Sequence, residues 1–305
     1  MEHGKHIDVL GLGSVTVDFV GNIRGWPEKG VKKPLESFAI CDGGLVGTAL
    51  VAVSRLGGNA AFAGKLGQSE MARRALDALA KEKIDTSFII RTEDAEPIVA
   101  FVLTDSADGQ RNIFWTKQGT QYPMPDEFPV KDWFKKVSVL LIDSVCGRAG
   151  IEAAGMARQY NIPVVIDIER NEPHAAEAMA LATHIIVGED FAADFTGKSD
   201  TTAMLKCLQR SPEQTVIITL GRKGCVGLSN DGIFELPAYK VEVVDTTGCG
   251  DVFHGAYALA VARRKSVIEA ARFASAAAAL CATKLGGRAG IPTMNQLQSF
   301  IDAQQ

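Results

Sequence analysis

Short apolar runs alternate with amphipathic stretches along the second half of the chain, from about residue 137 onward. The clearest runs read VSVLLID, IPVVIDI, THIIVG and QTVIITLG, at residues 137–143, 162–168, 183–188 and 214–221. Continuous apolar strands between helices are typical of a parallel sheet that helices cover on both faces. The pattern therefore predicts an α/β fold of three layers with a mostly parallel central sheet.

The first half of the chain adds strands of another kind. After an apolar strand at residues 7–13, apolar and polar positions alternate through residues 14–23, as in a strand with one exposed face. Residues 98–103 and 111–115 are also strand-like, and the Asp-Gly pair between them predicts a hairpin. These strands predict a small β-sheet lid. Its strands are expected within about residues 14–40 and 97–118.

Helical periodicity fills the gaps between these strands. Residues 46–56 and 69–83 repeat apolar positions every three to four residues, and Ser69 is a plausible N-cap for the second stretch. The alanine-rich residues 271–285 predict a helix that packs closely on both sides. No internal repeat or linker interrupts the pattern, so we expect one domain over residues 1–305.

Composition narrows the classes of partner. The chain of 305 residues has a net charge of −4 and a pI of about 5.8, and its Lys and Arg residues are scattered. We therefore expect small molecules as partners, and neither nucleic acid nor an anionic membrane. The six cysteines are far apart and form no C-x-x-C pair, which indicates reduced thiols. With no signal-peptide pattern and no apolar run of about 20 residues, we expect a cytoplasmic protein.

Two near matches to nucleotide-binding motifs fail on their context. GLGSVT at residues 11–16 lacks the third glycine of G-x-G-x-x-G, and a strand follows it where a helix is required. AADFTGKS at residues 192–199 lacks the first glycine of a P-loop and follows a helical segment instead of a strand. We interpret its Thr-Gly pair as the end of that helix.

A third glycine-rich turn fits its context. DTTGCGDVFHGA, at residues 245–256, lies between a strand-like segment at 240–245 and a helical one. The N–H groups of Gly248, Cys249 and Gly250 would begin the helix without internal partners, which is how helix N-termini bind phosphate. Asp251 has two readings from the turn alone: it caps the helix, or it faces the anion site as a base.

Other polar or glycine-rich positions point to the same crevice. A Gly43-Gly44 turn opens the helix at 46–56, and Asp18 lies on the alternating strand. TLGRKG at residues 219–224 ends a buried strand, and ligands of such sheets bind at the carboxyl ends of strands. Each feature alone is most often structural, but together they predict one site.

These residues resemble the ribokinase-like carbohydrate kinases, also called the PfkB family. Residues 245–256 match the family's C-terminal signature with one departure, Cys249 in place of the usual alanine. Asp18, the Gly43-Gly44 pair, FAGKLG at residues 62–67 and TLGRKG follow in the family's order. The resemblance covers essentially the whole chain, and it implies a single α/β domain whose small sheet closes over a sugar, with ATP along the carboxyl edge of the large sheet.

The resemblance also implies roles for particular residues. Asp251 would be the general base, and the backbone amides of residues 248–250 would stabilise the transferring γ-phosphoryl group of ATP. Asp18 and the Gly43-Gly44 turn would bind sugar hydroxyls. The nucleotide site would be lined by Thr219, Gly221 and Gly224. ATP brings Mg²⁺ with it.

Three positions depart from the family pattern or extend it. Thr48 stands where the family has a sugar-binding Asn. The N-x-x-E motif linked to Mg²⁺ is absent at residues 188–191, and Glu189, one step away, is the candidate ligand. Asp245 and Thr247 match positions that help to hold K⁺ in some members, so a monovalent cation is a further candidate.

We therefore expect an ATP-dependent kinase that phosphorylates a primary hydroxyl of a ketohexose, or of a related, even anionic, sugar. The cations that could meet an anionic sugar are Lys32, Lys33, Arg111 and Arg288. A nucleoside kinase of the same family and a catalytically silent sensor of sugar or nucleotide remain as alternatives. Exposed lid strands predict a homodimer.

Overall fold

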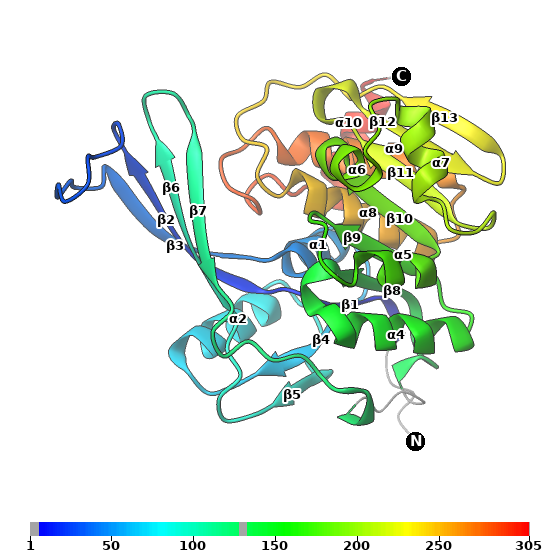
Figure 1. The fold of residues 1–305 in the computed structure, drawn as a ribbon, viewed down its shortest axis with the longest axis horizontal. Coiled ribbons are helices and arrows are strands. Elements are labelled where there is room, and N and C mark those ends of the chain that lie inside the picture. Colours follow the sequence, from blue (N-terminus) through cyan, green and yellow to red (C-terminus); the bar gives the residue numbers. More distant parts are fainter. Residues whose placement is uncertain (1–5, 128–132, 305) are drawn as a thin grey trace.

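A nine-stranded sheet forms the centre of the molecule in the computed structural model, which describes residues 6–127 and 133–304 (Figure 1). Its strand order is β13-β12-β11-β10-β9-β8-β1-β4-β5, and β12 is the one strand of this sheet that runs antiparallel to the others. The predicted parallel sheet is thus confirmed. The strands are β1 (Ile7–Leu12), β4 (Ala60–Leu66), β5 (Ile89–Arg91), β8 (Val137–Asp143), β9 (Val164–Ile168), β10 (His184–Gly188), β11 (Thr215–Thr219), β12 (Cys225–Ser229) and β13 (Gly232–Leu236).

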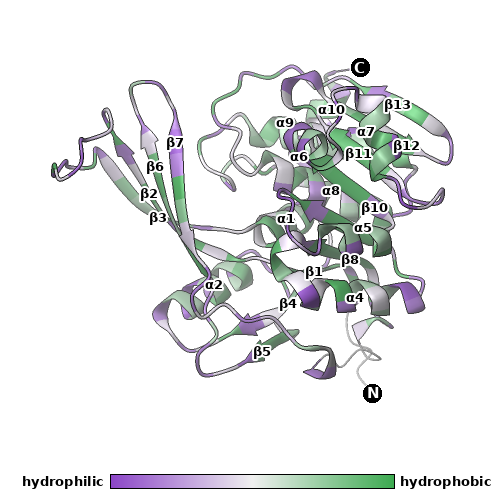
Figure 2. Cartoon of the chain, viewed as in Figure 1, coloured by the Kyte–Doolittle hydropathy of each residue, from purple (hydrophilic) through white to green (hydrophobic). Residues whose placement is uncertain are grey.

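Helices cover both faces of this sheet, because its strands are apolar at consecutive positions. Along β8, Val139 and Leu141 face one core cluster, and Leu140 and Ile142 face the other. Figure 2 shows the inner strands, such as β10, in the colour of apolar residues. One layer holds α1 (Leu45–Arg55), α2 (Glu70–Lys81), α8 (Cys249–Ala262), α9 (Val267–Cys281) and α10 (Met294–Asp302). The other holds α4 (Gly147–Gln159), α5 (Ala175–Leu181), α6 (Glu189–Thr196) and α7 (Thr201–Leu208).

A second, four-stranded sheet projects from one side of this core (Figure 1). Its order is β3-β2-β6-β7, with β2 parallel to β6 and the two outer pairs antiparallel. The predicted β6–β7 hairpin is confirmed, and Gly109 in its turn has φ 75°. The strands are β2 (Thr16–Ile23), β3 (Ser37–Gly43), β6 (Ile98–Asp105) and β7 (Arg111–Thr116).

Local signals in the sequence were correct at several element ends. The Ser69 hydroxyl accepts the N–H of Ala72 and caps α2. Gly197, with φ 65°, ends α6 in a left-handed conformation, as expected for the Thr-Gly pair that resembled a P-loop. The alanine-rich helix is confirmed as α9, although it begins earlier and ends at Cys281.

The strand predicted at residues 240–245 is wrong. These residues form an extended connection without a ladder, and the side chains of Val243 and Val244 are exposed. The N–H groups of Val244 and Asp245 donate to the carbonyl of Ala282, after α9. The turn that follows is therefore positioned by α9 and its C-terminal loop.

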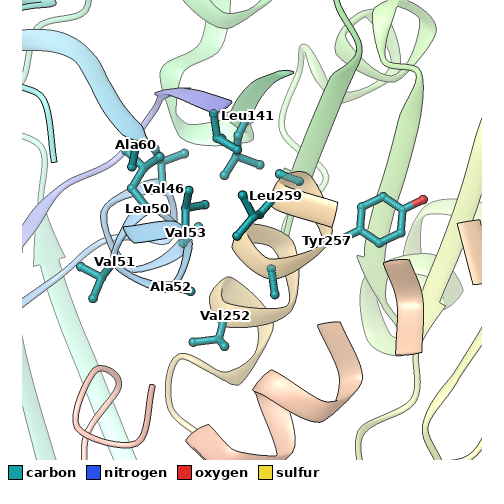
Figure 3. Packing of buried hydrophobic residues seen from close by; sticks show 14 of the residues in the cluster. Val46, Leu50, Val51, Ala52, Val53, Ala60, Leu141, Val252, Tyr257 and Leu259 are labelled. Carbon is teal, nitrogen blue, oxygen red and sulfur yellow. The ribbon is translucent and has the colours of Figure 1, made fainter. Parts of the chain in front are cut away.

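A close helix contact in the core joins α1 to α8 (Figure 3). Gly255 of α8 lies so close to α1 that a Cβ atom there would be 2.1 Å from the carbonyl oxygen of Ala49. Apolar side chains such as Leu50 and Leu259 fill the space around this contact. None of the described helices is long and apolar enough to cross a membrane.

Candidate active site

A cavity of ≈ 280 Å³ lies between the small sheet and the carboxyl edge of the large sheet. The small sheet contributes Asp18 and Arg111, and the N-terminal turns of α1 and α8 contribute Gly44 and Asp251. Segments that are more than 200 residues apart in the sequence thus meet at one cavity, which Asp18, Gly44 and Asp251 line but the glycine turn at residues 219–224 does not.

The turn before α8 requires glycine at residue 248. Gly248 is the N-cap residue with φ 75°, a left-handed conformation that favours glycine. A Cβ atom at this position would lie 2.5 Å from the carbonyl oxygen of Gly287. The backbone of the turn can therefore lie against the C-terminal loop only without a side chain at residue 248.

The three amides of this turn differ in their partners. The N–H of Cys249 donates to the carbonyl of Thr246 at 3.2 Å. In contrast, the N–H groups of Gly248 and Gly250 make no hydrogen bond to any residue that the structure describes. Two free amides and the positive end of the α8 dipole make this turn suited to an anion.

Asp251 lies in the first turn of α8, where no side chain caps the helix N-terminus. Its side chain lines the cavity instead. Burial, and next the charges of Asp167 and Glu169, raise the pKa of Asp251 well above its usual value, and Arg288 acts in the opposite direction. A partly buried carboxyl group beside two free amides can exchange a proton with a ligand in the cavity.

The opposite wall is formed by Asp18 and the turn that opens α1. A Cβ atom at Gly43 would lie 2.3 Å from Oδ2 of Asp18, so a side chain here would displace the Asp18 carboxyl group. Gly44 is the N-cap residue of α1 with φ 92°. Burial raises the pKa of Asp18, partly offset by Thr16 and by the charge of Arg288.

Thr48 is buried behind this turn and does not line the cavity. Its hydroxyl oxygen accepts a hydrogen bond from Nε of Arg288 at 3.3 Å, and Nη2 of Arg288 donates to the carbonyl of Gly43 at 2.7 Å. Arg288 thus fastens the C-terminal loop to the Gly43-Gly44 turn, close to Asp18 and Asp251.

The predicted nucleotide-binding residues lie at the end of β11, two strands from β9, along the same carboxyl edge of the large sheet. Thr219 ends β11, and its hydroxyl donates to the carbonyl of Val187 at 3.3 Å. Gly221 has φ 53° and Gly224 has φ 103°, and a Cβ atom at Gly224 would lie 2.0 Å from the carbonyl oxygen of Leu236. These residues do not line the ≈ 280 Å³ cavity.

The candidate metal ligands do not form a metal site by themselves. Glu189 lies at the start of α6, and its Oε1 is 3.5 Å from Nζ of Lys223. Within residues 6–127 and 133–304, no group of three or more His, Cys, Asp or Glu side chains could hold a metal ion. Glu189 lies near the turn of Gly221 and Gly224, where a metal would have to come with the nucleotide.

Asp245 and Thr247 form a network of their own. Oδ1 of Asp245 accepts the Thr247 N–H at 2.9 Å and the Thr247 hydroxyl at 2.7 Å, and Oδ2 accepts the N–H of Gly286 at 2.8 Å. Nη1 of Arg111 donates to the Thr247 hydroxyl oxygen and lies 3.8 Å from Oδ1 of Asp245. The chain's own donors satisfy this carboxylate, which does not favour K⁺ at its side chain.

The candidate cations for an anionic sugar separate into two groups. Arg111 lines the cavity, and Arg288 lies behind it. Lys32 and Lys33 are exposed in the loop after β2, where Nζ of Lys33 donates to the carbonyls of Arg24 and Gly25. The sequence interpretation missed Lys117 and Arg170, which line the cavity and lie 5.3 Å and 5.6 Å from the ring centroid of Trp115.

Acidic residues at strand ends were also missed. Asp143 ends β8, while Asp167 and Glu169 lie at the end of β9, and only Glu169 lines the cavity. His254 lies below them in α8 and is buried. An acid at the end of an apolar strand, as in VSVLLID and VVIDIE, was the available signal.

Comparisons with known proteins agree with this geometry. The model of the family described as pfkB family carbohydrate kinase matches residues 7–294. The chain is 29% identical to fructokinase-1 of Zea mays over 99% of both chains, and 29% identical to the ribokinase of Haemophilus influenzae over 95% of this chain and 97% of the relative. The crystal structure of a putative ribokinase from Agrobacterium tumefaciens superposes with a TM-score of 0.88, at 27% identity and over 99% of each chain.

Proposed function

Because the chain belongs to the pfkB family and is an ATP-dependent carbohydrate kinase, we propose that it transfers the γ-phosphoryl group of ATP to a primary hydroxyl of a ketohexose or a related sugar. One observation carries the proposal: Asp251 and Thr247, which flank the turn of residues 248–250 at the start of α8, line the same cavity as Asp18. A base, an anion site and a hydroxyl-binding acid are the groups that this reaction needs.

Asp251 takes the proton from the attacking hydroxyl, while Asp18 and the Gly43-Gly44 turn orient the sugar. Nucleophilic attack requires an ionised base, so the rate falls as the pH drops through the pKa of Asp251. Because burial raises that pKa, this loss begins at a higher pH than for an exposed aspartate. Arg288, which acts in the opposite direction, widens the pH range in which Asp251 is ionised.

The turn of residues 248–250 stabilises the charge that spreads over the transferring group. The free N–H groups of Gly248 and Gly250 are available for this, and the N–H of Cys249 joins them if it leaves the carbonyl of Thr246. Mg²⁺ arrives with ATP and neutralises phosphate charge, and Glu189 is the side chain that would meet it near the nucleotide turn of Thr219, Gly221 and Gly224.

Asp251→Asn tests the role of the base. It keeps the size of the side chain and removes its proton-accepting charge, so kcat should fall about 100- to 10,000-fold. The readout is sugar-dependent ADP release. Asp77→Asn, on the exposed side of α2, is the matched control and should retain wild-type turnover. An Asp251→Asn variant with near-wild-type kcat would exclude the mechanism.

A panel of acceptors tests the substrate class. Fructokinases among the relatives support a ketohexose, and the cations Arg111, Lys117 and Arg170 at the cavity support a sugar with an added anionic group. Higher kcat/KM on nucleosides than on any sugar would favour the nucleoside kinase. Thermal stabilisation by sugar or ATP without turnover of any acceptor would favour the silent sensor.

The face of the small sheet that points away from the cavity supports a homodimer. Ile40, Phe19, Phe101 and Phe114 are in register across its four strands, and Phe101 and Phe114 are 50% and 58% exposed. An apolar row of this kind is typical of a protein interface. We expect a dimer in size-exclusion chromatography with light scattering, and a monomer for Phe114→Asp but not for Ile233→Asp on β13. A monomeric wild type would refute this arrangement.

A cytoplasmic location belongs to the same proposal. All six cysteines carry free thiols, including the exposed Cys41. Free thiols persist in a reducing compartment. Fractionation of cells that express the tagged full chain is the measurement, and recovery outside the cytoplasm would contradict it.

A further inference from the structure

His254 is a buried group that the mechanism above does not use. It lies three residues after Asp251, about one turn further along α8, and is 5% exposed. Its ring contacts three elements: the first turn of α8, the middle of β10 and the end of β9. A polar ring enclosed in this way must have its hydrogen bonds satisfied by the protein.

The contacts of the ring determine how many protons it carries. Nδ1 is 2.8 Å from the carbonyl oxygen of Gly250, and Nε2 is 3.1 Å from the carbonyl oxygen of Ile186. Carbonyl oxygens only accept hydrogen bonds, so each ring nitrogen needs a proton, whereas a neutral imidazole has one. Oδ2 of Asp167 lies 3.3 Å from Nδ1, and both side chains are 6% exposed. An imidazolium paired with a carboxylate satisfies all three contacts.

These contacts fix the peptide next to the catalytic base. The carbonyl of Gly250 and the N–H of Asp251 belong to one planar peptide unit. The ring ties this peptide to Ile186 of the large sheet through its second nitrogen. Tilting the ring would therefore tilt the peptide from which the Asp251 side chain extends.

The ring also lies within a cluster of acidic groups. Burial, the largest influence, lowers the pKa of His254, while the carbonyls of Ile186 and Gly250 and the charge of Glu169 act against it. Burial, and next the charges of Glu169 and Asp143, raise the pKa of Asp167. The two carbonyl contacts of the ring carry the charged pair against both shifts, because a neutral ring can donate to only one of them. A positive charge here favours the ionised form of the neighbouring carboxyl groups. The elements packed around the ring carry these titratable and charged groups: Asp143 of β8, Asp167 and Glu169 at the end of β9, His184 at the start of β10 and Asp251 of α8, and Arg288 of the C-terminal loop acts on Asp251.

We propose that His254 is a positioning residue for phosphoryl transfer: as an imidazolium paired with Asp167, it fixes the Gly250–Asp251 peptide and places a positive charge beside the base. The proposal rests on the proposed function in one respect, because it takes Asp251 as the base. The protonation of His254 itself is independent of that assignment.

The first test reads the ring directly, without turnover. ¹⁵N NMR of histidine-labelled protein, with the His254 signals assigned by their loss in His254→Asn, should show protons on both ring nitrogens from about pH 6 to pH 8. Asp167→Asn keeps the shape of the partner and removes its charge, so His254 should lose one proton within this range. A singly protonated His254 in the wild type would overturn the proposal.

The second test separates charge from packing. In His254→Asn, kcat/KM near neutral pH should fall about 10- to 100-fold, since the base is less well aligned. The acid limb of the pH profile should move up by about one unit, because losing a nearby positive charge raises the pKa of Asp251. KM for ATP should stay within about threefold. An equal loss of kcat/KM at every pH would overturn the charged role.

Two further variants keep the tests decisive. If His254→Asn does not fold, the NMR comparison of the wild type with Asp167→Asn decides the protonation state. An active Asp251→Asn variant would remove the base assignment and with it the positioning role. An inactive Asp251→Asn variant in which His254 still carries two protons supports both.

Discussion

The two helices that open on glycine turns at the cavity, α1 and α8, differ in what occupies their N-terminal amides. At α1, the N–H of Leu45 donates to the Ser14 hydroxyl at 2.9 Å, and the N–H of Gly47 donates to the Ser14 carbonyl at 3.0 Å. At α8, the described structure provides an acceptor for Cys249 but none for Gly248 or Gly250. Ser14 thus binds two of the first amides of α1, while those of Gly44 and Val46 make no hydrogen bond to a described residue. At α8 only the amide of Cys249 is bound, so this helix end has more donors available for an anion.

The acidic residues near the two turns also differ in their contacts. Asp143 supports the start of α1 through Ser14, since its Oδ2 accepts both the N–H and the hydroxyl of Ser14, at 2.7 Å and 2.8 Å. Asp251 of α8 faces the cavity. The comparison teaches that a glycine turn before a helix is not by itself a phosphate site: its tertiary partners decide whether its amides are available.

Among the changes that compare the two helix ends, the largest effect should come from adding a side chain at Gly248, in the turn that opens α8. In Gly248→Ala, the new methyl group meets the carbonyl of Gly287 and the φ of 75° is strained, so the turn must move. We expect kcat to fall about 100- to 1,000-fold, the cost of losing an anion-stabilising donor. Steady-state kinetics at saturating sugar and ATP would measure it.

The control for this variant is Gly197→Ala. Gly197 has a similar φ of 65° at the end of α6, and nothing lies within 4 Å of a Cβ atom there. This variant should lose about 1 kcal/mol in free energy of unfolding, because alanine is strained in the left-handed backbone conformation, and its kcat should not change. Equal losses of kcat in both variants would show that strain, and not the anion site, is responsible.

A smaller effect of another kind should come from the N-terminus of α1, where Ser14 accepts two amides. Ser14→Ala removes one donor to Asp143 and leaves the N–H of Leu45 without its acceptor. The free energy of unfolding should fall by about 1–3 kcal/mol. KM for the sugar should rise about threefold to tenfold, with kcat at saturation changed less than about threefold, because α1 orients the acceptor and does not bear the transferred charge.

Ser69→Ala is the matched control for Ser14→Ala, because Ser69 also caps a helix but lies at α2. It should lose about 1 kcal/mol in chemical unfolding without any change in KM. A fall in kcat for Ser14→Ala as large as that for Gly248→Ala would erase the distinction between the two helix ends.

Whether a feature depends on neighbouring or on distant residues explains what the sequence could and could not predict. The cap at Ser69, the β6–β7 hairpin and the end of α6 depend on neighbouring residues, and each is correct. The strand predicted at residues 240–245 follows an alternating pattern, but the partner of this segment is the carbonyl of Ala282 and not a strand. A local pattern cannot reveal which distant group is present.

The candidate site shows the same limit at larger separation. The family signature at residues 245–256 identified Asp251 and its turn, since these residues are contiguous. Asp143 binds Ser14 across 129 residues, and Asp167 meets His254 from another strand. Each acid follows an apolar run, which predicts that it lies at the end of a strand but does not predict which residue it contacts. Predicting those contacts requires the order of the strands in the folded sheet.

The smallest effect should come from Cys249, the one departure from the family signature at residues 245–256. Its backbone N–H, and not its thiol, belongs to the turn, and its partly buried side chain packs against the core. Cys249→Ala should therefore keep kcat within about twofold, and the loss of one small buried group should cost about 1 kcal/mol or less in free energy of unfolding. Cys207→Ala, on α7, is the control for a change of thiol elsewhere. A tenfold loss of kcat in Cys249→Ala alone would mean that the anion site of α8 uses a side chain, and the contrast with α1 would then be one of side chains as well as of free amides.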